Sequence, residues 1–237
     1  SSKARGRRLA LVAAASASPH PRAVPVRSPS AFSPIAPVYR ADEVTGEIAV
    51  VSGGTRLTYR ELWMSASRIA GGLQTRGISI GDRVAIRFPN GVRWVQAFLG
   101  VLLSGAVPVP IDDALADAAA AHVLADCEAD FVLDDALPQG LPFIDDGASL
   151  SELAVLCYTR GTTGRPKGVE LSNENLMSAI ESVIRAEGLP GDGIRNLVLL
   201  PLAHASGCVD QLLPTLAVGG TLVLAPDLPE DGLRHVI

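Results

Sequence analysis

The 237-residue chain carries twenty basic and twenty-five acidic side chains, a formal net charge of −5, and 48% of its residues are hydrophobic. This apolar share is enough for a buried core, so a largely disordered chain is excluded. Residues 42–237 alone have a net charge of −12, and the whole chain has only ten aromatic residues. An acidic body with few rings argues against a nucleic-acid-binding surface, which needs basic groups and stacking side chains.

The first forty-one residues differ in composition from the rest, with seven basic groups, six prolines and no acidic residue. We therefore predict that residues 1–41 form an unpacked tail and that residues 42–237 form the folded part. The tail is either simply disordered or a leader, and its composition fits an organelle transit peptide better than a secretory signal. The secretory reading is weaker because the apolar stretch 9–17 is short and contains Ser16.

Three widely spaced cysteines fit neither a disulfide framework nor a zinc site, which favours a reducing compartment. No apolar run approaches the roughly 18 residues that span a bilayer. We expect a cytoplasmic protein, with an organelle as the alternative, and the sequence leaves the oligomeric state open.

Strand and helix patterns alternate along residues 42–237. A capping box begins a helix at Thr58, and we expect Asn90 and Ser172 to cap two further helices. Two more helices are predicted over 114–127 and 209–217. The predicted strands are 47–51, 55–58, 84–88, 106–111, 131–133, 153–157, 197–200 and 221–224. This alternation predicts an α/β fold of mostly parallel sheets flanked by helices.

The most informative stretch is YTRGTTGRPKGV, residues 158–169, directly after a predicted apolar strand. Glycines let several backbone N–H groups face one anion, hydroxyls add donors, and Lys167 supplies charge, so the loop suits a polyphosphate. Lys167 is also the only lysine after Lys3. The P-loop of kinases and NTPases needs glycine before the lysine and Ser or Thr after it. Here Pro166 and Gly168 occupy those positions, which disfavours that class.

The same stretch resembles the signature loop of the AMP-forming adenylating enzymes, which include acyl-CoA synthetases, firefly luciferase and peptide synthetase adenylation domains. The family pattern is Y-T-S-G-T-T-G-x-P-K-G-V, and the chain departs from it only at Arg160. Other segments resemble the family in the expected order: 57–62, 81–85, 105–110 and 200–207. The resemblance implies the N-terminal part of the family's large domain, without the later subdomains.

The resemblance also implies roles for individual residues. A group of loop residues would surround the phosphates of ATP: Thr159, Arg160, Gly161, Thr162, Thr163, Gly164 and Lys167. Lys167 and His204 would be the catalytic residues, with His204 beside the acyl and adenylate pocket. ATP with Mg²⁺, and CoA or a carrier protein's phosphopantetheine as acceptor, would be the cofactors. We assign no metal ligands, and we interpret the pairs at 112–113, 134–135 and 145–146 as solvated turns.

The family's activity is the conversion of a carboxylic acid to an acyl-adenylate, followed by thioester formation. Amino-acid-activating members have an aromatic-Asp pair in the region that here reads Ala203 to Ser206. Its absence favours a fatty or aryl acid. The ribose-binding aspartate, a magnesium-associated glutamate and a C-terminal lysine of the family are not found before Ile237, so we expect this portion to be incomplete by itself. The alternative is a non-catalytic remnant that binds nucleotide weakly or mediates interactions, favoured by Arg160 and by Ala203 in place of an aromatic residue.

We predict that Arg160→Ser raises adenylate formation, because a guanidinium crowds a loop whose other members are small. ATP–pyrophosphate exchange in the full-length protein measures this. An unchanged or lower rate would contradict the prediction.

Overall fold

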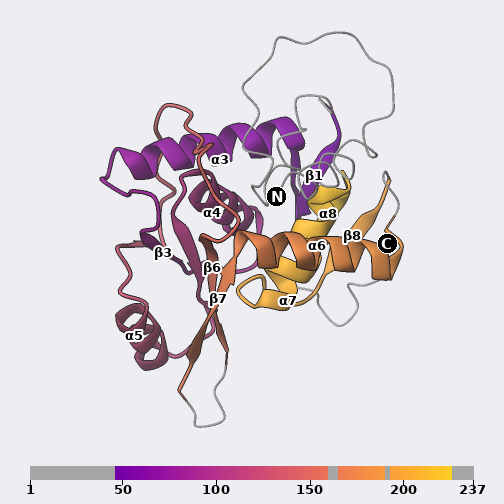
Figure 1. Ribbon diagram of the computed structural model, residues 1–237. Coiled ribbons are helices and arrows are strands. Elements are labelled where there is room, and N and C mark those ends of the chain that lie inside the picture. The colour runs from indigo at the N-terminus through magenta and orange to yellow at the C-terminus, as the bar shows by residue number, and fades with distance from the viewer. Residues whose placement is uncertain (1–45, 160–164, 190–192, 226–237) are drawn as a thin grey trace.

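The protein is described by a computed structural model that covers residues 46–159, 165–189 and 193–225 (Figure 1). The predicted tail 1–41 lies outside these residues. So do five predicted phosphate-loop positions: Arg160, Gly161, Thr162, Thr163 and Gly164. No helix in the described ranges has both the length and the apolar character needed to cross a membrane.

The elements follow the predicted alternation of strands and helices. The strands are β1 (Ile48–Ser52), β2 (Thr55–Thr58), β3 (Arg83–Ile86), β4 (Val107–Pro110), β5 (Phe131–Leu133), β6 (Leu153–Thr159), β7 (Lys167–Ser172), β8 (Arg195–Val198) and β9 (Thr221–Leu224). The main helices are α3 (Tyr59–Gln74), α4 (Val92–Leu103), α5 (Asp117–Asp126) and α6 (Asn173–Glu187). A short helical region follows as α7 (Ala205–Gly207), a π-helical turn η2 (Cys208–Leu212) and α8 (Leu213–Ala217).

The strands form three sheets in the described chain. One has the order β2-β1-β9-β8, a second has the order β4-β3-β5, and β6 and β7 form a two-stranded hairpin. The pairs β1–β9, β8–β9, β3–β4 and β3–β5 are parallel, whereas β1–β2 and β6–β7 are antiparallel. The predicted α/β class with mostly parallel sheets is therefore confirmed.

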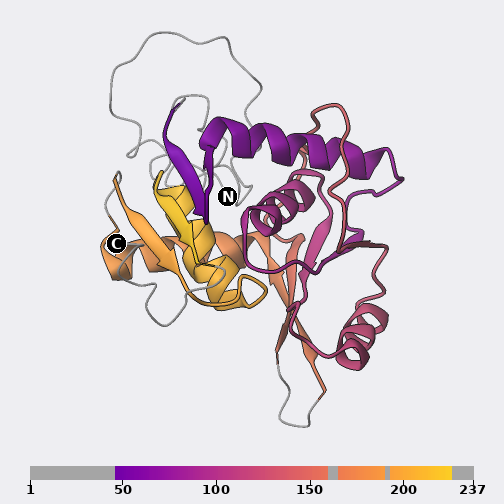
Figure 2. The ribbon, with the colours of Figure 1, turned by 180° about the vertical axis from the view of Figure 1, so that it is seen from behind.

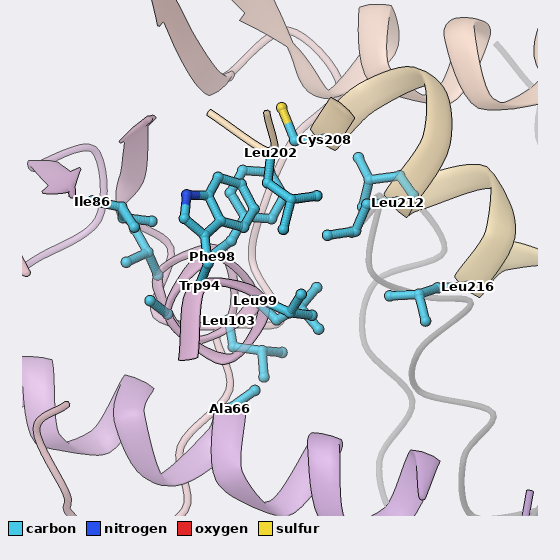
Figure 3. Close-up of a cluster of buried hydrophobic side chains, with 14 of the residues drawn as sticks. Ala66, Ile86, Trp94, Phe98, Leu99, Leu103, Leu202, Cys208, Leu212 and Leu216 are labelled. Atoms are coloured by element: carbon cyan, nitrogen blue, oxygen red, sulfur yellow. The ribbon is translucent and has the colours of Figure 1, made fainter. Parts of the chain in front are cut away.

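Helix α4 is the centre of the hydrophobic core. Trp94 and Phe98 are fully buried, and their rings stack with centroids 5.0 Å apart. Their neighbours come from the 202–216 region, including Leu202 and Leu212 (Figure 3). On its other side α4 packs against α3, as both ribbon views show (Figures 1 and 2). Burial of apolar surface stabilises a fold by roughly 25 cal/mol per Å². Because α4 contacts strands of both larger sheets, burying its large side chains holds the two sheets together.

Two glycines of α3, Gly71 and Gly72, allow the backbone of residues 138–143 to cross the helix at close range. Gly140 N–H donates to the Arg68 carbonyl and Phe143 N–H donates to the Ser67 carbonyl. A Cβ atom added at Gly71 would lie 1.8 Å from the Leu141 carbonyl oxygen. The backbone of this segment can therefore rest on α3 only where the helix has no side chain.

The structure corrects several expectations about individual elements. Helix α4 begins after Gly91, and no side chain caps it, so Asn90 is not the helix cap. Strand β7 was not predicted, because four of its six residues are exposed and its apolar alternation is limited to Val169 and Leu171. The predicted helix over 209–217 is interrupted by the π-helical turn η2, and α5 starts at Asp117 rather than near residue 114. The capping box at Thr58 and the helix cap at Ser172 are confirmed, and Ser172 also forms a capping box with Asn175 that was not predicted.

We predict that Gly71→Ala lowers the free energy of unfolding by about 1–3 kcal/mol, the usual cost of overpacking, because the new methyl group meets backbone rather than a movable side chain. Urea denaturation followed by circular dichroism measures the change. Gly54→Ala is the control, since nothing in the described structure lies within 4 Å of its Cβ position. Equal stabilities of the two variants would contradict the prediction.

Candidate active site

The β6–β7 hairpin places two predicted site residues opposite each other. The strands pair from Leu153 with Ser172 to Thr159 with Lys167, so these last two residues form the end of the ladder. Both side chains are exposed. Directly opposed residues in an antiparallel pair have Cβ atoms about 4.5–5.5 Å apart. The threonine hydroxyl and the lysine ammonium group therefore stand at the two ends of the Gly/Thr-rich loop.

An open pocket lies beside this end of the hairpin, with about 410 Å³ of empty space, part of it open to solvent. Three segments far apart in the sequence line it: the end of β4 with the following loop and α5, the ends of the hairpin, and the segment before α7. The lining residues are Pro110, Ile111, Asp112, Leu115, Val123, Tyr158, Thr159, Pro166, Ala203 and His204. The pocket is mainly apolar, and it brings Thr159 and His204 of the predicted site together.

His204 is held at both its backbone and its ring. Its N–H donates to the Pro201 carbonyl at 3.1 Å, and its own carbonyl accepts from Gly207 N–H at 2.9 Å and Cys208 N–H at 3.0 Å. The ring atom Nε2 lies 3.4 Å from Oδ2 of Asp112. The expectation that residues 112–113 form only a solvated turn is therefore wrong for Asp112, whereas Asp113 is exposed.

Asn90 connects the start of α4 to the segment that leads to His204. Its Nδ2 donates to the Leu200 carbonyl at 2.9 Å, and its Oδ1 accepts from Leu202 N–H at 2.8 Å. Both hydrogen-bonding groups of one carboxamide are thus used on two backbone groups more than 100 residues away. This pairing explains why Asn90 does not cap α4.

Tyr158 forms part of the pocket wall and is tied to α5. Its hydroxyl donates to Oδ2 of Asp126 at 2.6 Å. Burial, together with the hydrogen bond and the negative charge of Asp126, raises the pKa of Tyr158 above its ordinary range. The phenol therefore stays protonated and keeps the hairpin joined to the last turn of α5. At its first turn, α5 is held by the ion pair of Arg87 with Asp117 at 3.0 Å.

Cys157 and Cys208 are buried thiols without disulfides, as predicted for packing residues. They lie next to each other, and a hydrogen bond from Cys208 lowers the pKa of Cys157 while the same bond and burial raise that of Cys208. Cys208 Sγ also lies 3.3 Å from the His204 carbonyl oxygen. The two thiols therefore fill the space between β6 and the helical region after His204.

Sequence reasoning missed Asp112 and Asn90 as parts of the site. The available signal for Asp112 was its position after a predicted parallel strand, since sites in parallel α/β sheets gather at the carboxyl ends of strands. The signal for Asn90 was weaker, because an asparagine before a helix is first interpreted as a cap.

The family model described as "AMP-binding enzyme" matches residues 39–143 and 143–236. The chain belongs to this family. It is 35% identical over 210 residues to a feruloyl-CoA synthase of an Amycolatopsis species, covering 79% of this chain and 43% of that protein. It is 31% identical over 205 residues to surfactin synthase subunit 1 of Bacillus subtilis, covering 79% of this chain and 6% of that protein.

Solved structures agree on the fold. A putative long-chain-fatty-acid CoA ligase from Rhodopseudomonas palustris matches with a TM-score of 0.75 and 26% identity, over 84% of this chain and 58% of that chain. A fatty acyl-adenylate ligase from L. pneumophila, in complex with acyl adenylate and pyrophosphate, matches with a TM-score of 0.73 and 24% identity. The match covers 82% of this chain and 39% of that chain. The chain thus spans less than half the length of the feruloyl-CoA synthase that it matches.

We predict that Asn90→Ala lowers the free energy of unfolding by about 1–3 kcal/mol, because two backbone groups lose their partner. Thermal and urea denaturation measure this. Gln96→Ala is the matched control, since this carboxamide lies on α4 and, within the described residues, shares no hydrogen bond with the 200–202 segment. A loss of stability no larger than that of the control would contradict the assignment.

Proposed function

We propose that this chain is the N-terminal part of an enzyme that activates a carboxylic acid with ATP. An oxygen of the acid's carboxylate attacks the α-phosphorus of ATP, the bond to the β-phosphate oxygen breaks, and pyrophosphate leaves with an acyl-adenylate as product. In the whole protein, the thiol of CoA or of a carrier protein's phosphopantetheine then displaces AMP to form a thioester. The single observation that carries the proposal is the pairing of Thr159 with Lys167 beside the His204 pocket.

Each of these residues has a proposed task. Lys167, a compact ammonium group at the exposed end of β7, would contact the phosphate oxygens and offset charge that grows as pyrophosphate departs. Thr159 and the loop residues 160–164 would donate hydrogen bonds to the same phosphates. His204 would contact the acyl-adenylate from the pocket side. No nucleophilic side chain is required, because the substrate itself attacks.

Magnesium accompanies ATP in this chemistry, but the described residues do not fit a protein-held metal. Among them, no three His, Cys, Asp or Glu side chains gather into a ligand set. Mg²⁺ bound with ATP would offset the charge of its phosphates.

The residues that line the pocket support the proposal that the substrate is a carboxylic acid without an amino group. Its described lining residues are mostly aliphatic, and the one carboxylate among them, Asp112, already faces His204. A carboxylate free to meet a substrate ammonium is missing from the lining residues. Similarity to feruloyl-CoA synthases points in the same direction, toward an aryl acid, with a fatty acid as the second choice.

A second candidate is a remnant that binds nucleotide without turnover. The observation in its favour is Arg160, a large cation where the family pattern has a small hydroxyl residue. ATP–pyrophosphate exchange with aryl, fatty and amino acids separates the two, run on the full-length gene product and on this chain. Exchange with any acid by the full-length product supports the enzyme. Nucleotide binding without exchange supports the remnant.

We predict that Lys167→Ala slows exchange by about a hundredfold, the usual cost of removing one preorganised charge-stabilising group. Lys167→Arg should recover only part of the rate, because a planar guanidinium does not replace a compact ammonium. Lys3→Ala changes the chain's other lysine and serves as the control. A Lys167→Ala rate equal to that of Lys3→Ala would remove Lys167 from the mechanism.

A further inference from the structure

We propose that Asp112 is a positioning residue that fixes the ring orientation and tautomer of His204. The proposal concerns the same pocket and rests on the proposed function for its effect on activity. Nε2 of His204 and Oδ2 of Asp112 are 3.4 Å apart, and the two residues are 92 positions apart in the sequence. No motif in the sequence links them, so the pairing is a product of the tertiary structure.

Asp112 is well placed to hold another group because its own backbone and carboxylate are fixed. Ile111 N–H donates to the Ile86 carbonyl at 2.9 Å, which extends the β3–β4 ladder to the residue before Asp112. Oδ1 of Asp112 accepts from Ala114 N–H at 3.0 Å, and its carbonyl accepts from Leu115 N–H at 3.0 Å. Only Oδ2 remains for His204. The side chain is 22% exposed, which limits competition from water.

His204 has a fixed backbone, so its orientation depends on its two side-chain torsions. The hydrogen bonds of its N–H and carbonyl with Pro201, Gly207 and Cys208 hold the main chain. The side chain is 38% exposed and, among the described residues, its Nε2 lies within hydrogen-bonding distance of Asp112. Without Asp112, the ring could rotate and exchange its proton between the two nitrogens.

The chemistry of the pair sets the tautomer. An ionised carboxylate can only accept hydrogen bonds, so the nitrogen that faces it must carry the hydrogen. The neutral ring therefore carries its proton on Nε2 and has an acceptor lone pair on Nδ1. A ligand in the pocket then meets one defined arrangement of the imidazole rather than a mixture.

The first experiment observes the tautomer directly. Long-range ¹H–¹⁵N spectra of histidine-labelled protein distinguish the protonated from the unprotonated ring nitrogen, and His204→Gln assigns the signal among the four histidines. The measurement is made at alkaline pH, so that the spectrum reports the neutral ring. We expect the Nε2–H form in the unaltered chain.

Two substitutions of Asp112 should change the tautomer in different ways. In Asp112→Asn, Oδ1 still accepts from Ala114 N–H, so Nδ2 turns toward the ring and favours the Nδ1–H form. Asp112→Ala should give a mixture of both forms. Asp113→Asn alters the adjacent exposed carboxylate and should give the spectrum of the unaltered chain. Retention of the Nε2–H form in both Asp112 variants would overturn the proposal.

The second experiment tests whether Asp112 acts through His204. In the full-length protein, Asp112→Ala should slow pyrophosphate exchange by about tenfold, the effect of one charge-assisted hydrogen bond. In a His204→Ala background the same change should have no further effect, because contacting residues that act as a unit are not additive. A tenfold loss in both backgrounds would overturn the proposal. Absence of exchange in the unaltered protein would refute the proposed function. The tautomer spectra would still test whether Asp112 sets the tautomer of His204.

Discussion

The structure depends on the burial of α4 between the parts of the molecule that carry the site. The stacked rings of Trp94 and Phe98 contact the region around Leu202, and the opposite side of the helix rests on α3 (Figure 3). Because interiors are packed as densely as crystals, a fixed helix fixes what touches it. Asn90, just before α4, is thereby placed to hold the backbone that leads to His204.

The pocket illustrates how weak individual contacts become an ordered site. Asn90 fixes a backbone segment, Asp112 faces the ring of His204, and Tyr158 joins the hairpin to α5 through Asp126. The net contribution of one hydrogen bond to stability is only about 1 kcal/mol, so no single bond determines the arrangement. Together they connect β4, the β6–β7 hairpin and the segment before α7, which come from three distant parts of the chain.

Much of the fold was predictable because it depends on local patterns. The capping box at Thr58 and the cap at Ser172 satisfy helix N–H groups with side chains three residues away, and both caps were recognised. Strand β7 was missed because most of it is exposed and its apolar alternation is limited to two residues, Val169 and Leu171. The interruption after Cys208 was missed because a π-helical turn keeps the same apolar residues as a regular helix.

The sequence by itself determined the phosphate-loop motif, the α/β class and the membership of the AMP-binding enzyme family, because these depend on residue identity and on spacing along the chain. Only the tertiary structure decided that Thr159 faces Lys167, that Asp112 meets His204 and that Asn90 binds Leu200 and Leu202. The physical reason is the distance along the sequence between the contacting residues. The last two contacts join residues about 90 to 110 positions apart, and no local pattern encodes which distant partner satisfies a polar group once the core has packed.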